Sequence, residues 1–217
     1  MVAHLMTIVL AYLVGSIPSG YLLVKYVFTE GEDVRAYGSG ATGATNVTRV
    51  TGLKGGALTY LCDAGKGILA VGLSGWINHH DLWWMGVAGI LAILGHIFPV
   101  WIGFRGGKGV ATGVGSFVLL SPWAILSALV VWGVTVYWKR YVALGSILAA
   151  AAVPPLVILW EGYIFSRPAE QVAALVTVTL IGCGVVIAAH HENIKRLLRG
   201  IEDRIGESPG GAKGNRG

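Results

Sequence analysis

Residues 110–138 decide how many helices the fold contains, and they read VATGVGSFVLLSPWAILSALVVWGVTVYW. This run carries no charged residue, so it can form one long apolar helix or two helices that break at Ser121 and Pro122. Proline is poorly tolerated inside a helix but suits the first turn of one. The stretch therefore favours a break, and the rest of the chain has to decide between the two arrangements.

The whole chain has the composition of a membrane protein. Of its 217 residues, 54% are hydrophobic and 12% are charged, whereas soluble domains usually carry about 25% charged residues. Apolar blocks at 2–24, 82–102, 141–160 and 172–189 each approach or reach the roughly 20 residues that cross a bilayer core. The first block is too long for a removable secretory signal and lacks its basic start. An ordinary soluble globule is excluded.

The distribution of charge decides between six and seven spans. The seven-span arrangement has its helices at 2–24, 54–77, 82–102, 108–120, 122–138, 141–160 and 172–189. It leaves only Arg167 on one side of the membrane. The other basic loop residues then lie on the opposite side: Lys25, Arg35, Arg49, Lys54, Arg105, Lys108, Lys139, Arg140 and all those from Lys195 onward. With six spans, Lys139, Arg140 and the basic C-terminal segment would lie on the opposite side of the membrane, which contradicts the positive-inside bias. We therefore predict an all-α polytopic membrane protein with seven transmembrane helices, the N-terminus outside and the C-terminus cytoplasmic.

The end of the chain is polar. Residues 192–205 read ENIKRLLRGIEDRI, with apolar residues spaced like one face of a helix. Such a helix would lie on the inner membrane surface or pack on the bundle as a short solvated helix, and both interpretations stay open. Residues 206–217 contain turn residues without apolar periodicity, so we predict a disordered tail after a single domain over 1–205.

A glycine-rich loop on the predicted inner side reads GSGATGATNVTR, residues 38–49. Small residues leave backbone N–H groups accessible, hydroxyls add donors, and Arg49 can bind an oxyanion through two parallel hydrogen bonds. These features favour a phosphate-binding loop over a flexible connector.

A second inner loop, FRGGKGVAT at 104–112, repeats this chemistry. Lys108 stands where a helix begins, so its ammonium and the free N–H groups of the helix would face the same anion. The spacing is not that of a P-loop, because neither lysine of the two GKG tripeptides is followed by Ser or Thr. Nucleotide binding is therefore unsupported.

Two further polar clusters are unusual for an apolar chain. Asp63 and Lys66 lie inside the predicted span 54–77, where an unpaired charge costs at least about 2.5 kcal/mol; they either form a structural pair or face a wet cavity. His190 and Asn193 share a helix face at the inner end of the last span and can point into one cavity. No repeated spacing of histidines and carboxylates indicates a metal site, and we predict neither metal nor cofactor.

Five motifs carry a resemblance to a known family. They are GSIPSG at 15–20, GSGATGATNVTR at 38–49, DAGKG at 63–67, GHIFPVWIGFRGGKGVAT at 95–112 and HHENIKRLLRGIE at 190–202. In this order, and over nearly the whole chain, they resemble the motifs of the bacterial acyl-phosphate:glycerol-3-phosphate acyltransferases. The sequence departs from that family at Ala41, where Asn is usual, which removes one donor from the loop.

The resemblance implies transfer of a fatty acyl group from acyl phosphate to the 1-position of sn-glycerol 3-phosphate, giving lysophosphatidic acid and phosphate in the first acylation of bacterial phospholipid synthesis. It implies an acyl groove between helices. The catalytic residues it implies are Ser39, Arg49, Lys108, His190 and Asn193, and the substrate-binding ones are Gly38, Gly40, Thr45, Asn46, Lys66, His96, Gly107 and Arg196.

Acyl phosphate is already activated, so no covalent enzyme intermediate is required. The base is the donor's own phosphate, which the resemblance favours, or His190. The expected partners are the two substrates, membrane lipid and, as a candidate, a soluble acyl-phosphate synthase, without nucleic acid. The expected location is the bacterial inner membrane, with the active site facing the cytoplasm.

Two other classes of protein compete with the enzyme. A transporter of a small phosphorylated anion would also contain intramembrane charges, but such proteins usually show repeated halves and a midplane site reached from both sides. A packing subunit of a larger complex would explain the 33 glycines, but not four polar clusters on one side. The sequence favours the acyltransferase.

Overall fold

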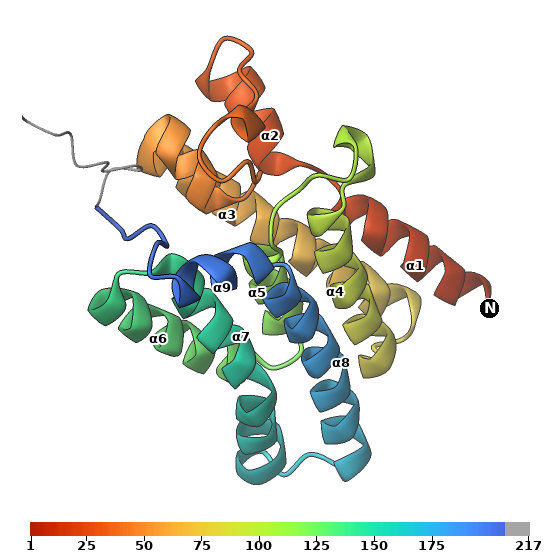
Figure 1. Cartoon of the computed structure of the whole chain (residues 1–217). Helices are drawn as coiled ribbons and strands as arrows, with labels where there is room; N and C mark the ends of the chain where they lie inside the picture. Colours follow the sequence, from red (N-terminus) through yellow and green to blue (C-terminus); the bar gives the residue numbers. More distant parts are fainter. Residues whose placement is uncertain (207–217) are drawn as a thin grey trace, which may run out of the picture.

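The computed structural model describes residues 1–206, and all regular structure in that part of the chain is helical (Figure 1). The α-helices are α1 (Val2–Gly15), α2 (Ser19–Leu23), α3 (Ala44–Ile77), α4 (Leu82–Ile97), α5 (Val110–Val118), α6 (Pro122–Lys139), α7 (Val142–Val157), α8 (Ala169–Ala188) and α9 (His191–Leu198). Short π-helical segments, Val24–Phe28 and Ile158–Ile164, and 3-10 turns, Val34–Ala36 and Val100–Ile102, complete them. The all-α prediction is confirmed.

Four segments of the described chain are long and apolar enough to cross a membrane. They are Val2–Phe28, Leu82–Ile102, Val142–Ile164 and Ala169–Ala188, which correspond to four of the predicted spans. Of the helices at the remaining three, α3 carries the buried Asp63 and Lys66 and α5 has only 9 residues. The count of seven spans therefore stays a prediction.

The predicted break at Ser121 and Pro122 is confirmed. α5 ends at Val118, and Pro122 occupies the first position of α6, where proline is tolerated. The Ser121 hydroxyl donates a hydrogen bond of 2.6 Å to Oε1 of the buried Glu161, whose Oε2 lies 2.6 Å from Nε of Arg167. This cluster holds the α5–α6 turn against the end of the α7 segment.

Glycines let α3 and α5 cross in backbone contact. A Cβ atom on Gly115 would overlap the carbonyl oxygen of Ala64, and one on Gly67 would overlap the carbonyl oxygen of Thr112. Phe117 and Ile93 are buried in the apolar core beside this crossing. The close contact fixes where α5 begins relative to α3, and therefore where Lys108 lies.

The predicted helix over 192–205 is wrong beyond Leu198. α9 ends there, and Gly200 adopts a left-handed conformation with φ 71°, which favours glycine and commonly terminates helices. Ile201 and Ile205 are exposed and do not extend the apolar face of α9. The predicted tail over 206–217 lies, apart from Gly206, outside the described residues.

Candidate active site

The loop before α3 is organised by Asn46. Its buried amide nitrogen Nδ2 donates to the carbonyl oxygens of Val34, Tyr37 and Ala41 at 2.9 to 3.1 Å, and its Oδ1 accepts the N–H of Ser39 at 3.1 Å. All polar atoms of this side chain therefore serve the backbone of the loop. The expected phosphate contact of Asn46 is replaced by a positioning role, and Ala41 contributes through its carbonyl group, which an Asn would also supply.

Two glycines and two hydroxyls of this loop lie near its surface. Gly38 and Gly40 have φ values of 53° and 69°, and a Cβ atom on Gly38 would overlap Oδ1 of Asn46. Ser39 and Thr45 are exposed. The loop thus keeps its hydroxyl donors accessible while Asn46 holds it from below.

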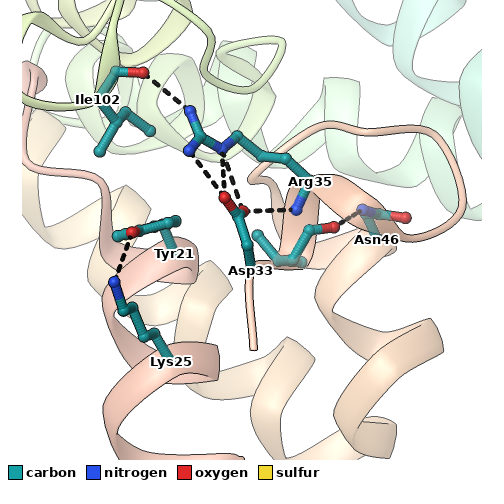
Figure 2. A network of polar contacts seen from close by, with 7 residues as sticks. Tyr21, Lys25, Asp33, Arg35, Asn46 and Ile102 are labelled. Carbon is teal, nitrogen blue, oxygen red and sulfur yellow. Dashed lines mark hydrogen bonds and ion pairs between the residues drawn. The ribbon is translucent and has the colours of Figure 1, made fainter. Parts of the chain in front are cut away.

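Arg35 joins this loop to the one before α5, as Figure 2 shows. Its Nε and Nη2 donate to the carboxylate of Asp33 at 2.8 to 3.1 Å, and its Nη1 donates to the carbonyl oxygen of Ile102 at 2.8 Å. The N–H of Thr42 adds a bond of 3.3 Å to the carbonyl oxygen of Gly106. The two glycine-rich loops, distant in sequence, are therefore neighbours.

The second loop rests on His96 at the end of α4. The N–H groups of Gly106 and Gly107 donate to the carbonyl oxygens of Ile97 and His96, both at 3.1 Å. A Cβ atom on Gly106 would overlap the carbonyl oxygen of His96, and one on Gly107 would overlap its ring nitrogen Nε2. Both glycines are required for this approach, which places Lys108 immediately before α5.

Lys108 lies among the other charged residues of the site. Burial lowers the pKa of Lys108 to about 8; the carboxylate of Glu202 opposes this shift, and the positive charges of Arg196 and Arg49 add to it. These interactions show that residues from α3, α9 and the chain after α9 gather around one ammonium group. Below pH 8 that group is predominantly charged.

His190, between α8 and α9, has a defined tautomer. Its Nδ1 lies 2.8 Å from the carbonyl oxygen of Val186, which can only accept a hydrogen bond. Nδ1 therefore carries the hydrogen, and Nε2 of the neutral ring is an acceptor. Burial lowers the pKa of His190 to about 4, with Val186 and Glu202 opposing the shift and Lys108 adding to it. The ring is neutral at pH 7.

Asn193 presents a second acceptor. Its Nδ2 donates to Oε1 of Glu202 at 2.6 Å, and its buried Oδ1 has no hydrogen-bond partner within the described residues. A buried carbonyl oxygen without a partner is costly, so this atom is available to accept a hydrogen bond.

Two acidic residues that the sequence reasoning missed complete the cluster. Oε2 of Glu202 accepts from Nε of Arg196 at 2.7 Å, and Oδ2 of Asp203 accepts from Nη2 of Arg49 at 2.9 Å. Glu202 closes the fifth motif of the chain, which was the one available signal. The contact of Asp203 had none, because it joins distant parts of the sequence.

Lys66 and His96 lie elsewhere, in a buried cluster with Asp63. Nζ of Lys66 is 2.9 Å from Oδ1 of Asp63 and donates to the carbonyl oxygen of Ile17, also at 2.9 Å. Nδ1 of His96 is 3.5 Å from the same carboxylate oxygen. The structural pair is therefore the correct alternative for Asp63 and Lys66. Lys66 and His96, which were expected to bind substrate, connect the turn between α1 and α2 with α3 and α4, and His96 also contacts the second loop.

An apolar cavity begins beside this site. Its lining comes from α5, α6, α7 and α8 and includes Val110, Phe117, Ile125, Trp132, Val153 and Val186. Val110 follows Lys108 by two positions, and the carbonyl group of Val186 holds His190. Two residues of the cavity lining are therefore neighbours of the polar cluster.

Comparison with known proteins agrees with this arrangement. The family model described as glycerol-3-phosphate acyltransferase matches residues 5–200. A glycerol-3-phosphate acyltransferase of Syntrophotalea carbinolica is 46% identical over 197 residues, covering 90% of this chain and 94% of that protein. Another from Trichlorobacter lovleyi is 45% identical over 207 residues, covering 94% and 99%.

Solved structures show the same fold. Crystal structures of PlsY (YgiH), an integral membrane glycerol 3-phosphate acyltransferase, in its glycerol 3-phosphate and lysophosphatidic acid forms both align with a TM-score of 0.81 and 36% identity. The alignments cover 94% of this chain and 96% and 95% of the two structures. By its sequence motifs, its fold and the cluster at its polar loops, the chain belongs to the glycerol-3-phosphate acyltransferase family.

Proposed function

We propose that this protein transfers a fatty acyl group from acyl phosphate to the 1-position of sn-glycerol 3-phosphate, which yields lysophosphatidic acid and phosphate. One observation carries the proposal: Arg49, Lys108 and Arg196 gather with the acceptors of His190 and Asn193 next to residues that line an apolar cavity. The reaction needs cations for phosphate, acceptors for hydroxyls and an apolar channel for the acyl chain. The names of the relatives support the same substrate.

Arg49, Lys108 and the accessible donors of the first loop bind phosphate oxygens. Arg49 already donates to a carboxylate oxygen, which has the acceptor geometry that a phosphate oxygen offers. Ser39 and Thr45 are exposed on the same loop, which Gly38 and Gly40 shape through their positive φ angles. Charge-assisted hydrogen bonds of this kind contribute about 1.5 to 3 kcal/mol each.

His190 and Asn193 hold the glycerol part of the substrate. Both present an acceptor, Nε2 of the neutral ring and the unpaired Oδ1 of the amide. Lone pairs repel a phosphate dianion but accept hydrogen bonds from hydroxyl groups. The 1-hydroxyl of glycerol 3-phosphate therefore lies beside His190, next to residues that line the cavity.

The chemical step follows from these positions. The oxygen of the 1-hydroxyl attacks the carbonyl carbon of the acyl phosphate, the bond between that carbon and the bridging phosphate oxygen breaks, and its electron pair leaves with phosphate. The hydroxyl proton passes to the departing phosphate, because His190, with a pKa of about 4, is too weak a base to hold it at neutral pH. Lys108 and Arg49 bind the phosphate group of sn-glycerol 3-phosphate, and their positive charges also stabilise the negative charge on the nearby departing phosphate.

Lys66, Asp63 and His96 act through the second loop and not on the substrate. Their buried cluster supports the turn at Gly106 and Gly107, and that turn sets the position of Lys108. The acyl chain occupies the apolar cavity, whose lining gives it the environment of a helix bundle core.

The membrane arrangement completes the proposal. Seven spans, an external N-terminus and a cytoplasmic C-terminus in the bacterial inner membrane place the active site at the cytoplasmic face, where soluble sn-glycerol 3-phosphate is accessible. In support, both glycine-rich loops and α9 carry the basic residues that prefer that side. A soluble acyl-phosphate synthase remains a proposed source of the donor.

The test uses purified full-length protein in detergent with sn-glycerol 3-phosphate and either acyl phosphate or acyl-CoA. We expect lysophosphatidic acid and inorganic phosphate in equal amounts with acyl phosphate, and no product with acyl-CoA. Protein carrying Lys108→Ala is the matched control for background acylation. Turnover with acyl-CoA alone, or no lysophosphatidic acid with either donor, would contradict the proposal.

A further inference from the structure

The last described segment brings a carboxylate to a residue of the substrate site. Oδ2 of Asp203 lies 2.9 Å from Nη2 of Arg49, although the two residues are 154 positions apart. A carboxylate and a phosphate offer a guanidinium group the same kind of oxygen acceptors. Asp203 therefore occupies the place that the proposed function assigns to a substrate phosphate oxygen.

Asp203 lies between two attached neighbours in a segment without regular structure. Glu202 on one side bonds Arg196 and Asn193. Ile205 on the other side pairs with Arg140, through its N–H at 2.8 Å and its carbonyl oxygen at 2.6 Å. The segment can keep both attachments while the short side chain of Asp203 changes rotamer and leaves Arg49.

The two carboxylates differ in how easily they can be replaced. The Glu202 side chain is 7% exposed and makes two bonds, so its removal would leave buried partners unsatisfied. Asp203 is 43% exposed and its partner Arg49 is 31% exposed. An ion pair this accessible changes an equilibrium by about two- to fivefold, which a phosphate dianion can overcome.

The charges of the site favour such an exchange. Arg49 and Arg196 both disfavour the charged form of Lys108, so these cations require counter-charge, and Asp203 supplies it at Arg49. A substrate phosphate brings its own negative charge, and a carboxylate next to it is repulsive. Arg49 therefore favours one anion at a time.

We infer that Asp203 is an internal counter-anion of Arg49 that exchanges with the phosphate group of sn-glycerol 3-phosphate, and thereby lowers the affinity of the site for substrate and displaces the phosphorylated product. This inference rests on the proposed function for the identity of the substrate. Asp203 does not contact the reacting atoms; it acts through Arg49.

The test is the equilibrium dissociation constant of sn-glycerol 3-phosphate, measured by titration calorimetry on the full-length protein in detergent at low salt. Asp203→Asn should bind about two- to fivefold more tightly than the original protein. Glu192→Gln is the matched control, because Glu192 is an exposed carboxylate that pairs with Lys195 on α9 at 2.8 Å, and its loss changes the net charge equally. It should leave the dissociation constant unchanged.

A double-mutant cycle distinguishes an effect of the contact between Asp203 and Arg49 from an effect of the change in net charge. In an Arg49→Ala background, Asp203→Asn should no longer tighten binding, because the partner of the exchange is absent. An unchanged or weaker affinity of Asp203→Asn, an equal gain in Glu192→Gln, or a gain that persists without Arg49 would each overturn the inference.

Formation of lysophosphatidic acid by the same preparation tests the proposed function separately. If the enzyme is active but its affinity for sn-glycerol 3-phosphate does not change in Asp203→Asn, the exchange is rejected and the acyltransferase function stands. If the dissociation constant shifts as expected but the protein forms no lysophosphatidic acid, the exchange stands and acyl transfer is rejected.

Discussion

Two clusters in this protein each contain a lysine and a histidine, and they differ in how their charges are paired. The buried cluster, Asp63, Lys66 and His96, is 1%, 6% and 6% exposed, and its lysine is bonded within the helix bundle. The loop cluster, Arg49, Lys108, His190, Asn193 and Arg196, lies at the glycine-rich loops and α9, and it combines the buried His190 and Asn193 with the exposed Arg49. Lys108 has a lowered pKa there, and the Oδ1 atom of Asn193 is unpaired.

The difference shows that unusual polar residues in an apolar chain mark two different structures. A lysine and a carboxylate three positions apart on one helix can neutralise each other locally. The cations of the loop cluster come from distant segments, and Arg49 finds its carboxylate, Asp203, only through tertiary packing. The number of distant segments that supply the charged groups, more than residue type, therefore separates the candidate binding site from the structural cluster.

The largest effect should come from breaking the buried cluster. Lys66→Met leaves the Asp63 carboxylate buried without its partner and should lower the free energy of unfolding by about 3 to 5 kcal/mol, measured by denaturation in detergent. The double variant Asp63→Asn with Lys66→Met should recover part of that loss, since no charge remains unpaired. Normal stability of Lys66→Met with a raised KM for sn-glycerol 3-phosphate would place Lys66 among the phosphate ligands.

Lys108→Ala should do the reverse, with lost activity and unchanged stability. Losing a charge-assisted contact of about 1.5 to 3 kcal/mol lowers kcat/KM about tenfold to over a hundredfold if the contact is made in the transition state. Initial rates of lysophosphatidic acid formation measure this loss. Lys54→Ala, which removes an exposed lysine of α3, is the control and should match the unaltered protein. A large fall in melting temperature for Lys108→Ala would contradict the comparison.

The pH dependence of binding should identify the charge on Lys108. Because its pKa is lowered to about 8, the charged form predominates below that pH and is lost as pH rises through it. The dissociation constant of sn-glycerol 3-phosphate should therefore rise above pH 8, by about tenfold per pH unit at most. Lys108→Arg keeps its charge and should move this loss to higher pH. The same alkaline limb in Lys108→Arg would assign it to another group.

His190→Ala should have the smallest effect. It removes one hydrogen bond between neutral groups, worth about 0.5 to 1.5 kcal/mol, and should weaken substrate binding about two- to tenfold. Because the pKa of His190 is about 4, the shape of the pH profile of kcat/KM should not change near neutrality. If a limb of that profile disappears while binding stays normal, His190 is the general base and the phosphate of the donor is not.

Sequence alone determined the features that depend on neighbouring residues. Apolar run lengths predicted helices, Pro122 marked the break before α6, and the glycine-rich motifs located both loops and the junction at His190. These signals are local, because helix formation, turn conformation and proline geometry depend on a few consecutive residues. The pairing of Asp63 with Lys66 was open for the same reason: spacing allowed it, but burial was needed to select it.

Only the tertiary structure decided which polar groups are already satisfied. Asn46 and Lys66 match the family motifs as well as Lys108 does, yet packing turns the first toward the loop backbone and the second into the bundle. Gly200 ended a helix that the apolar spacing extended, and the chain beyond it brought Asp203 to Arg49 across 154 positions. Such contacts depend on how distant segments pack against each other, and no local sequence pattern encodes this packing.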